Sequence, residues 1–274
     1  MAVRCDDNHP DLWCGRLPVL SRDAHKYDRG HALIAGGYPK TGAARLAARA
    51  AARIGAGLVT VAVPEIAFPI YASALTSIMV EPIADESGLA SLLRDGKFAA
   101  LLVGPGAGVG EHTRDAVCTM LATGLATVLD ADALTSFSDG PEALFDQLHA
   151  HCVLTPHEGE FTRVFDVEGS KVERASLAAK QSGAVMILKG SETVIAAPDG
   201  RVIVSQNAPP TLATAGSGDV LAGIVLGLIA QGMQPFFAAA AAVWIHGAAA
   251  EAFGAGLIAD DLPDLLPAVL RQLA

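Results

Sequence analysis

The sequence predicts an α/β fold in which helices cover both faces of a mostly parallel sheet. Short β-branched or aliphatic runs alternate with alanine- and leucine-rich stretches of helical spacing, the pattern typical of such a sheet. Of the 274 residues, 51% are hydrophobic and only 18% are charged, so a large buried core can form. No repeat, Ser/Gly linker or low-complexity block interrupts the sequence. We therefore expect one domain over 25–274, preceded by an irregular extension over 1–24.

Short apolar runs bounded by turn residues predict the parallel strands. They span 32–35, 58–63, 77–80, 99–103, 126–129, 153–154 and 185–188. Two later runs, 193–197 and 202–205, are joined by Pro198-Asp199-Gly200 and predict an antiparallel hairpin after the last parallel strand.

Stretches with apolar residues at helical spacing predict helices between and after the strands. They span 43–54, 113–123, 172–182, 220–229, 236–253 and 262–273. The most hydrophobic part, 220–253, is interrupted by Gln231 and Pro235 and carries His246 and Glu251. Each half is shorter than the ~20 residues of a membrane span, so two buried helices and no membrane partner are expected.

The charge balance and the cysteines limit the partners and the compartment. With 19 basic and 29 acidic residues, the formal charge of −10 opposes binding to nucleic acid or to an anionic membrane. Cys5, Cys14, Cys118 and Cys152 form no CxxC pair, and Cys5, His9 and Cys14 lack structural zinc spacing, so no metal site is expected. Reduced thiols and an N-terminus unlike a signal peptide predict a cytoplasmic protein.

The segment 213–220 combines two glycines, a serine and an aspartate where an apolar helix should begin. Free backbone N–H groups at a helix start can face an anion, so Ala215, Gly216, Ser217 and Gly218 predict a phosphate-binding turn. Asp219 would repel that phosphate unless a proton or a metal lies between them. This aspartate is therefore the candidate catalytic residue.

Other glycine-rich and polar segments follow the predicted strands, where open α/β sheets place ligands. Gly36-Gly37 with Lys40 opens a helix without Walker A order, and it is either a packing turn or a ligand-lining loop. Gly104 to Gly108 fits a substrate wall better than a dinucleotide fingerprint or a plain turn. Asp130 and Asp132 either hold a metal through water or cap a helix near Ala133, and capping is favoured.

Two further strand ends carry ionisable groups. Thr155 to Glu160 places an imidazole and two carboxylates at the head of a helix, either for ligand binding or only as a helix cap. Lys189 to Thr193 brings an ammonium, a glycine N–H and two hydroxyls to a tight turn. These groups can bind phosphate, although a hairpin could use them without a ligand.

In this order, the motifs resemble the ribokinase-like superfamily and, more narrowly, the ADP-dependent NAD(P)H-hydrate dehydratases. The similarity covers about 25–252 and is tightest over 55–61, 188–190 with Thr193, and 213–223. It implies a three-layer α/β/α fold with a late antiparallel hairpin. It also implies a lyase that uses ADP to dehydrate nicotinamide cofactors hydrated at C6 (S-NADHX or S-NADPHX), returning NADH or NADPH with AMP and phosphate.

The resemblance also implies roles for individual residues. Asp219 would be catalytic, and the nucleotide would be bound by Lys189, Gly190, Ser191, Glu192, Thr193 and Gly218. The hydrated cofactor would be lined by Ala43, Gly104, Gly106, His157 and Asp219. Mg²⁺ would arrive with ADP, and a homo-oligomer, a tetramer by resemblance, would form.

Some positions depart from the family pattern. Glu158 stands where the family usually has proline, Ala215 where a further glycine is common, and Lys40 lies in a shortened loop. These differences concern loop geometry near the substrate more than the reaction type. The family often carries an epimerase domain, for which the residues before His25 leave no room, so a separate epimerase is the expected partner.

Two other functions fit the same motifs. One is an ATP-dependent kinase of a small molecule such as a vitamin precursor, since a fold alone does not fix function. The other is a nucleotide-binding regulator without catalytic activity. Product analysis distinguishes the three possibilities.

Overall fold

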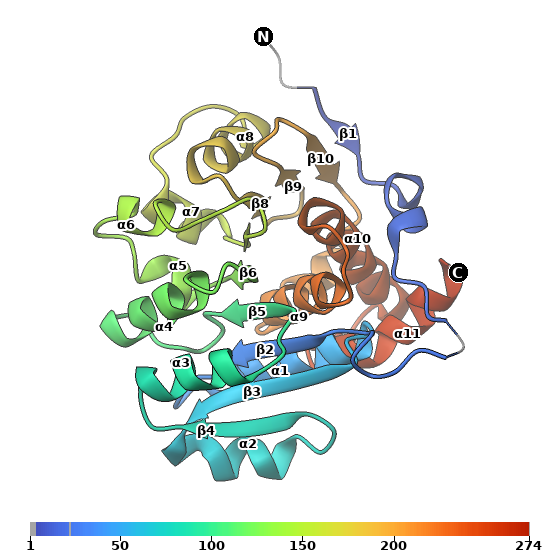
Figure 1. The fold of residues 1–274 in the computed structure, drawn as a ribbon. Helices are drawn as coiled ribbons and strands as arrows, with labels where there is room; N and C mark the ends of the chain where they lie inside the picture. Colours follow the sequence, from blue (N-terminus) through green and yellow to red (C-terminus); the bar gives the residue numbers. More distant parts are fainter. Residues whose placement is uncertain (1–3, 22, 274) are drawn as a thin grey trace.

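The computed structural model describes residues 4–21 and 23–273, and within them one sheet organises the chain (Figure 1). Its strand order is β1-β10-β9-β8-β7-β6-β5-β2-β3-β4. All neighbouring strands are parallel except that β9 is antiparallel to both β8 and β10, which confirms the predicted hairpin. The strands are β1 Asp6–Asp7, β2 His31–Ala35, β3 Leu58–Pro64, β4 Met79–Ile83, β5 Ala100–Val103, β6 Ala126–Leu129, β7 Val153–Leu154, β8 Val185–Leu188, β9 Thr193–Ala196 and β10 Val202–Ser205.

Helices cover both faces of the sheet, as the predicted three-layer α/β/α architecture requires (Figure 1). On one face lie α1 (Thr41–Arg53), α9 (Ser217–Ala230), α10 (Pro235–Phe253) and α11 (Leu262–Gln272). On the other lie α3 (Glu86–Asp95), α4 (Glu111–Leu121), α5 (Asp132–Thr135), α6 (Glu142–Phe145), α7 (Glu158–Val164) and α8 (Lys171–Ser182). Alternate residues of each strand feed the two cores: Ile34 and Leu102 point to the first, and Leu33 and Leu101 to the second.

The predicted strands and helices are all present, with ends shifted by a few residues, but the four-residue α6 and two longer helices were missed. The two longer helices are α2 (Phe68–Ala74), which follows β3, and α3, whose first turn is capped by Asp85 accepting from the Gly88 N–H at 3.0 Å. α2 is short and begins beside Pro69, and α3 has polar residues on much of its surface. Neither gives the long apolar period by which the other helices were found.

Helix α9 lies directly on α1 because two of its glycines allow close approach. A Cβ atom added at Gly223 would lie 2.2 Å from the Ala47 carbonyl oxygen, and one at Gly227 would lie 2.7 Å from that of Ala51. A side chain at either position would push the two backbones apart. This contact fixes the start of α9 above the carboxyl ends of the strands.

The N-terminal extension is part of the fold, although the sequence predicted an irregular segment over 1–24. Asp6 and Asp7 pair in parallel with Ile203 and Val204 of β10, and Asn8 N–H donates to the Val204 carbonyl at 2.7 Å. Trp13 is completely buried in the core that contains α10. The described residues of this segment, 4–21, 23 and 24, otherwise form no helix or strand apart from two short 3₁₀ turns at Pro10–Leu12 and Cys14–Arg16.

The apolar helix α10 belongs to the core. Its length and composition would allow a membrane span, but 67% of its most apolar window is buried within the protein. It packs against α9, α11 and the sheet. The prediction of two buried helices for this region is confirmed.

Candidate active site

The ends of the parallel strands and the start of α9 come together at one edge of the sheet. The carboxyl ends of β6, β7 and β8 lead directly into Asp130, Thr155 and Lys189. Because parallel strands all point the same way, these ends lie side by side. Lys189 N–H donates to the Pro156 carbonyl at 2.9 Å, which joins two of these segments directly.

Helix α9 begins with an uncapped turn that faces this edge. Its N-cap is Gly216 in the left-handed region (φ 91°), and no side chain accepts a hydrogen bond from the first turn. A Cβ atom at Gly216 would lie 2.6 Å from Leu46 Cδ1, so the turn needs glycine for space as well as for conformation. Free N–H groups at a helix start form an anion site.

Asp219 stands in the first turn of α9 and is the most perturbed carboxylate of this edge. Burial raises its pKa to about 7, the negative charge of Asp130 adds to the effect, and the Lys189 ammonium opposes it. Asp132 and Glu160 also raise the pKa of Asp219. A carboxylate that titrates near neutral pH can accept a proton from a substrate hydroxyl.

Lys189 lies beside carboxylates from two different segments. Its Nζ lies 2.8 Å from Asp130 Oδ1 and 3.9 Å from Glu160 Oε2, and both carboxylates are almost fully buried. Burial opposes the charge of the lysine, but Asp130 and Glu160 outweigh it and raise its pKa. For Glu160, burial is the dominant cause and its pKa is raised. A Cβ atom at Gly218 would lie 3.3 Å from Lys189 Nζ, so this cation also borders the α9 turn.

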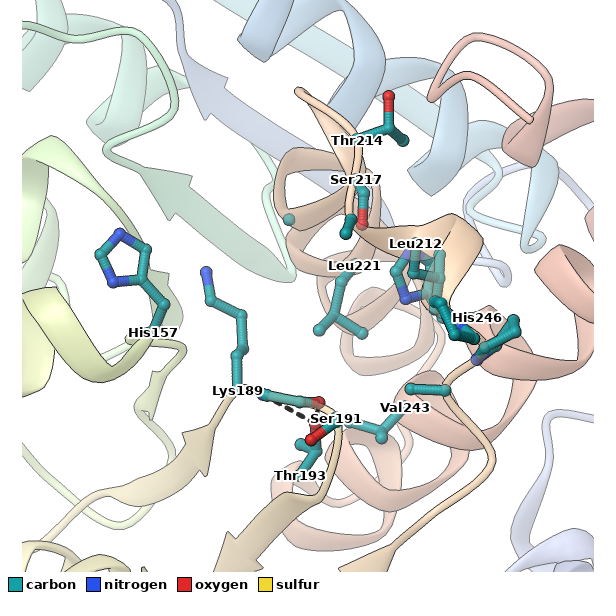
Figure 2. Close-up of a pocket in the computed structure, with 16 residues that line it drawn as sticks. His157, Lys189, Ser191, Thr193, Leu212, Thr214, Ser217, Leu221, Val243 and His246 are labelled. Carbon is teal, nitrogen blue, oxygen red and sulfur yellow. Dashed lines mark hydrogen bonds between the residues drawn. The ribbon is translucent and has the colours of Figure 1, made fainter. Parts of the chain in front are cut away.

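A cavity of about 570 Å³ opens beside these groups, large enough for a small-molecule ligand (Figure 2). In Figure 2, Lys189 and His157 lie on one side, and Leu212, Ser217 and His246 lie on the other. The lining joins the β8–β9 turn, the segment before α9 and helix α10. Its members are His157, Lys189, Gly190, Ser191, Thr193, Ala208, Pro209, Pro210, Leu212, Ala213, Thr214, Ser217, Gly218, Leu221, Val243 and His246.

The β8–β9 turn is held in shape from within and from outside. Thr193 Oγ1 accepts from the Gly190 N–H at 3.3 Å and donates to the Gly190 carbonyl at 3.0 Å. Lys171 Nζ at the start of α8 donates to the carbonyls of Lys189, at 3.0 Å, and Glu192, at 2.5 Å. The turn is thus preformed, and Lys189, Gly190, Ser191 and Thr193 line the cavity.

Glu158, which the resemblance places where proline is usual, is connected to this turn. Its carboxylate makes a bidentate ion pair with Arg174, at 2.9 and 3.0 Å, and lies 3.6 Å from Lys171 Nζ. The hydrogen bonds and charge of Arg174 and the charge of Lys171 lower the pKa of Glu158 despite the opposing effect of burial. Glu158 therefore helps to position the lysine that holds the turn.

His157 is both a helix cap and part of the cavity wall. Its Nδ1 accepts from the Glu160 N–H at 3.1 Å, while Glu160 Oε2 accepts from the His157 N–H at 2.9 Å, which forms a capping box on α7. The capping alternative is thus present in the structure. The imidazole lines the same cavity as Lys189, and not the glycine loops with which the sequence grouped it.

The glycine loops form a second, adjacent group. A Cβ atom at Gly37 would lie 1.8 Å from the Gly106 carbonyl oxygen, and one at Gly106 would lie 3.3 Å from Ala43 Cβ, so the loops after β2 and β5 touch each other. A Cβ atom at Gly104 would likewise collide with the Asp130 carbonyl oxygen, so the loop after β5 also touches the end of β6. The buried Tyr71 hydroxyl donates to the Gly37 carbonyl at 2.9 Å and supports the first loop. A smaller cavity of about 90 Å³ borders Gly36, Gly37 and Ala107.

The favoured interpretation of Asp130 and Asp132 as helix caps is wrong. The N-cap of α5 is Ala131, and no side chain accepts from its first turn. Asp130 instead pairs with Lys189, and Asp132 Oδ2 accepts from the Gly108 N–H at 2.8 Å. Within 4–21 and 23–273, no three His, Cys, Asp or Glu side chains gather as a metal site.

The structure separates the predicted site residues into those at the cavity and those outside it. Lys189, Gly190, Ser191, Thr193 and Gly218 line the cavity together. Ala43, Gly104 and Gly106 lie at the neighbouring glycine loops, and Asp219 lies in the α9 turn between the two groups. The Glu192 side chain is half-buried and is not among the residues that line the cavity, and Gln206 Nε2 donates to its Oε2 at 3.3 Å. Ala215 and Gly216 lie beside the cavity and do not line it.

Sequence reasoning missed Lys171 and His246 as neighbours of the site. Lys171 gives no local motif, because its partners are two carbonyls of the β8–β9 turn, which comes about 20 residues later in the chain. His246 is the single imidazole of a mostly apolar helix, and this feature was visible in the sequence. There it argued only against a membrane span.

This fold and the site at its strand ends define a ribokinase-like α/β protein. A solved structure of a ribokinase-like superfamily protein from Enterococcus faecalis matches with a TM-score of 0.86 at 24% identity, over 98% of this chain and 96% of that one. The predicted fold class is confirmed.

A family model described as NAD(P)H-hydrate dehydratase matches residues 31–270, and the chain belongs to this family. It is 35% identical to the ADP-dependent (S)-NAD(P)H-hydrate dehydratase of Cenarchaeum symbiosum, over 93% of both chains. The ADP/ATP-dependent NAD(P)H-hydrate dehydratase of Bacillus subtilis, crystallised with ATP and Mg²⁺, matches with a TM-score of 0.86 at 29% identity over 100% of both chains.

Other relatives are longer than this chain. The bifunctional NAD(P)H-hydrate repair enzyme Nnr of Salinibacter ruber is 44% identical over 93% of this chain but 51% of its own length. The chain spans about half the length of the curated bifunctional relatives that it matches.

Proposed function

We propose that this chain catalyses the ADP-dependent dehydration of S-NADHX or S-NADPHX to NADH or NADPH, with release of AMP and phosphate. Family membership supports the reaction class. The observation that carries the proposal is Asp219, a carboxylate with a pKa of about 7 placed beside an uncapped helix start and the Lys189 ammonium. A proton acceptor next to an anion site is what transfer of a phosphoryl group to a hydroxyl requires.

The reaction follows from the poor leaving ability of a hydroxyl group. Asp219 takes the proton of the C6 hydroxyl, and the C6 oxygen then forms a bond to the β-phosphorus of ADP while the bond from that phosphorus to the bridging oxygen breaks, leaving AMP. The ring nitrogen lone pair next expels phosphate from C6. Loss of a proton from the adjacent ring carbon restores the dihydronicotinamide.

The protein contributes positioning and charge to these steps. The N–H groups of the α9 turn face the transferring phosphoryl group, and Lys189 offers a positive charge from the opposite wall. The large cavity, with Gly190, Ser191, Thr193 and Gly218, accommodates the rest of the nucleotide. The glycine loops at Ala43, Gly104 and Gly106 receive the hydrated nicotinamide, and His157 would reach this ligand from the wall of the large cavity.

Mg²⁺ fits this site as part of the nucleotide complex. The carboxylates of Asp130 and Glu160 are already directed to Lys189, so the described residues offer no complete set of ligands of their own. When bound with ADP, Mg²⁺ would neutralise charge on the phosphate oxygens.

Recovery of the near-ultraviolet absorbance of reduced nicotinamide from the hydrated cofactor, with and without ADP, tests the proposal. We expect recovery only with nucleotide and formation of one AMP per cofactor repaired. Phosphorylation of a vitamin alcohol by ATP, with no AMP formed from ADP and hydrated NADH, would instead indicate the kinase. A protein that binds ADP and turns over neither substrate would be a regulator.

The partners and the compartment remain part of the proposal. We expect a homo-oligomer, a tetramer by resemblance, because the apolar side chains Ile66, Phe68, Ile70 and Met79 are exposed near the sheet-end strand β4. Light scattering coupled to size-exclusion chromatography measures the oligomeric state. A separate NAD(P)H-hydrate epimerase and a cytoplasmic location stay predictions, the latter favoured by four free cysteines.

A further inference from the structure

A chain of hydrogen bonds links the N-terminal segment to the wall of the large cavity. Trp13 Nε1 donates to Asn8 Oδ1 at 3.0 Å, and Asn8 Nδ2 donates to Ser205 Oγ at 3.1 Å. The Ser205 hydroxyl donates to Asn207 Oδ1 at 2.9 Å, and Asn207 Nδ2 donates to the Trp244 carbonyl at 2.8 Å. Asn8, Ser205 and Asn207 each accept one bond and donate the next, so the four bonds run in one direction.

Both asparagines bind helix α10. Asn8 Nδ2 donates a second bond to the Ala240 carbonyl at 2.8 Å, and Ala240 precedes Trp244 by about one helical turn. Gly247 leaves room for Asn207, because a Cβ atom there would lie 2.5 Å from the Asn207 carbonyl oxygen. The serine between the two amides is only 2% exposed. Hydrogen bonds in such a buried network favour a single arrangement of its groups.

Asn207 stands where one wall of the cavity begins. Most of the segment 208–214, which follows it, lines the cavity. Val243 and His246 line the cavity from α10, and Trp244 lies between them in the sequence. The bond from Asn207 to Trp244 therefore joins two walls of one cavity. Within 208–214, all of it described, no side chain makes a hydrogen bond, so Asn207 is the side-chain anchor of this wall.

We propose that this chain of bonds positions the cavity wall for the nucleotide, with Asn207 as a positioning residue and Asn8 acting through it. This inference rests on the proposed function, because it takes ADP as the occupant of the cavity. None of the described residues before 25 lines the cavity, so the N-terminal segment acts on bound ADP without touching it. The loops after β2 and β5 contribute no residue to the chain of bonds, and the effect is therefore confined to the nucleotide.

Steady-state kinetics and calorimetric titration with ADP test the proposal. In Asn207→Ala, we expect the KM and the Kd for ADP to rise about 3- to 10-fold, which corresponds to the loss of about one hydrogen bond. The kcat at saturation and the KM for the hydrated cofactor should stay as in wild type. Asn8→Ala should show a smaller change of the same kind, about 2- to 3-fold. The double variant should bind ADP no more weakly than Asn207→Ala, because Asn8 acts through Asn207.

Two further variants separate positioning from a general effect on the fold. Gly247→Ala places a methyl group against Asn207 without removing a hydrogen-bonding group, and it should also weaken ADP binding. Gln231→Ala is the matched control, because Gln231 Nε2 likewise donates to a helix carbonyl, that of Gly227, at 2.8 Å. Gln231 follows the last residue of α9 and does not line the cavity. Its loss should lower the melting temperature and leave ADP binding as in wild type.

The outcomes distinguish this inference from the function on which it rests. If folded Asn207→Ala or Asn8→Ala binds ADP as tightly as wild type, the inference is wrong. Equal weakening in Gln231→Ala would also overturn it, since the effect would then reflect a general loss of stability. Asn8→Ala decides the question if the variants at Asn207 and Gly247 do not fold. If wild type binds no ADP, both the proposed function and the inference are wrong.

Discussion

Lys189 Nζ lies 2.8 Å from Asp130 Oδ1, so the cation of the nucleotide turn is held by a carboxylate from two strands away. Asp130 is 2% exposed at its side chain, and the pair is therefore a buried one. Breaking such a pair by removing one partner costs more than removing both, because a lone charge stays buried. Lys189 thus has two separable roles, in stability and in ligand binding.

A double variant separates these roles. Lys189→Met should lower the free energy of unfolding by about 3–5 kcal/mol, because it leaves Asp130 unpaired, and Lys189→Met/Asp130→Asn should recover most of that loss. ADP affinity should fall by about 10- to 100-fold in both variants, since neither has the cation. Urea unfolding and calorimetry measure the two effects. The exposed Lys180→Met on α8 is the control, and unchanged ADP affinity without Lys189 would contradict the phosphate role.

The pH dependence of kcat/KM should report the carboxylate of Asp219. With a pKa of about 7, the residue is a base only when ionised, so kcat/KM should rise with pH and level off above about neutrality. Asp130 raises this pKa and Lys189 lowers it. The midpoint should therefore move to lower pH in Asp130→Asn and to higher pH in Lys189→Met. Asp95→Asn, an exposed change on α3, should leave the midpoint in place, and equal shifts in both site variants would exclude this assignment.

Asp219→Asn should separate catalysis from binding. Turnover should fall by several orders of magnitude, as for loss of a catalytic base. ADP binding should not weaken, because the substitution only removes a negative charge that repels the phosphates. Single-turnover assays and calorimetry measure both. Turnover close to wild type would show that another group takes the proton.

The same variant should be more stable than wild type at alkaline pH. The folded pKa of Asp219 lies above its ordinary value, so the folded state holds this proton more tightly than the unfolded chain does. Wild type therefore loses stability as pH rises from about 4 to about 7, and the variant does not. The melting temperature of Asp219→Asn should exceed that of wild type at pH 8, with a difference that shrinks toward pH 4.

Lys171 is expected to act as a positioning residue for the nucleotide turn. Its ammonium holds the carbonyls of Lys189 and Glu192, and Lys171 itself does not line the cavity. Lys171→Met should raise the KM for ADP about tenfold, because the turn loses its external support, and kcat at saturation should change little. Steady-state kinetics measure this split, and Lys171→Arg should restore part of the affinity. An equal fall of kcat in Lys171→Met would indicate a role in the chemistry.

The sequence predicted elements well where the signal was local. The strands 126–129, 153–154 and 185–188 were placed correctly because each is a short apolar run with polar residues directly after it. The Gly216 to Asp219 turn was recognised because helix starts and glycines carry local meaning. Such features depend on neighbours within a few residues.

Features that depend on distant partners were missed or misread. Asp130 was interpreted as a cap because its true partner, Lys189, is 59 residues away. Asp6 and Asp7 have low strand propensity and pair only because β10 offers an open edge. Neither partner is visible in a window of sequence.

The N-terminal segment provides a last prediction, about where the cooperative unit of the fold begins. Trp13 is 0% exposed, its ring centroid lies 5.8 Å from that of Trp244, and its Nε1 donates to Asn8 Oδ1 at 3.0 Å. Trp13→Ala should lower the free energy of unfolding by about 3–5 kcal/mol, as for other large core truncations.

Urea unfolding of Trp13→Ala should remain one transition with an unchanged slope, because the segment unfolds together with the rest. Val19→Ala, in the same segment but 93% exposed, is the matched control and should unfold as wild type does. If Trp13→Ala and Val19→Ala are equally stable, residues before 25 do not belong to the cooperative unit. In that case the division of the chain at 24 and 25 would describe its folding correctly, despite the pairing of β1 with β10.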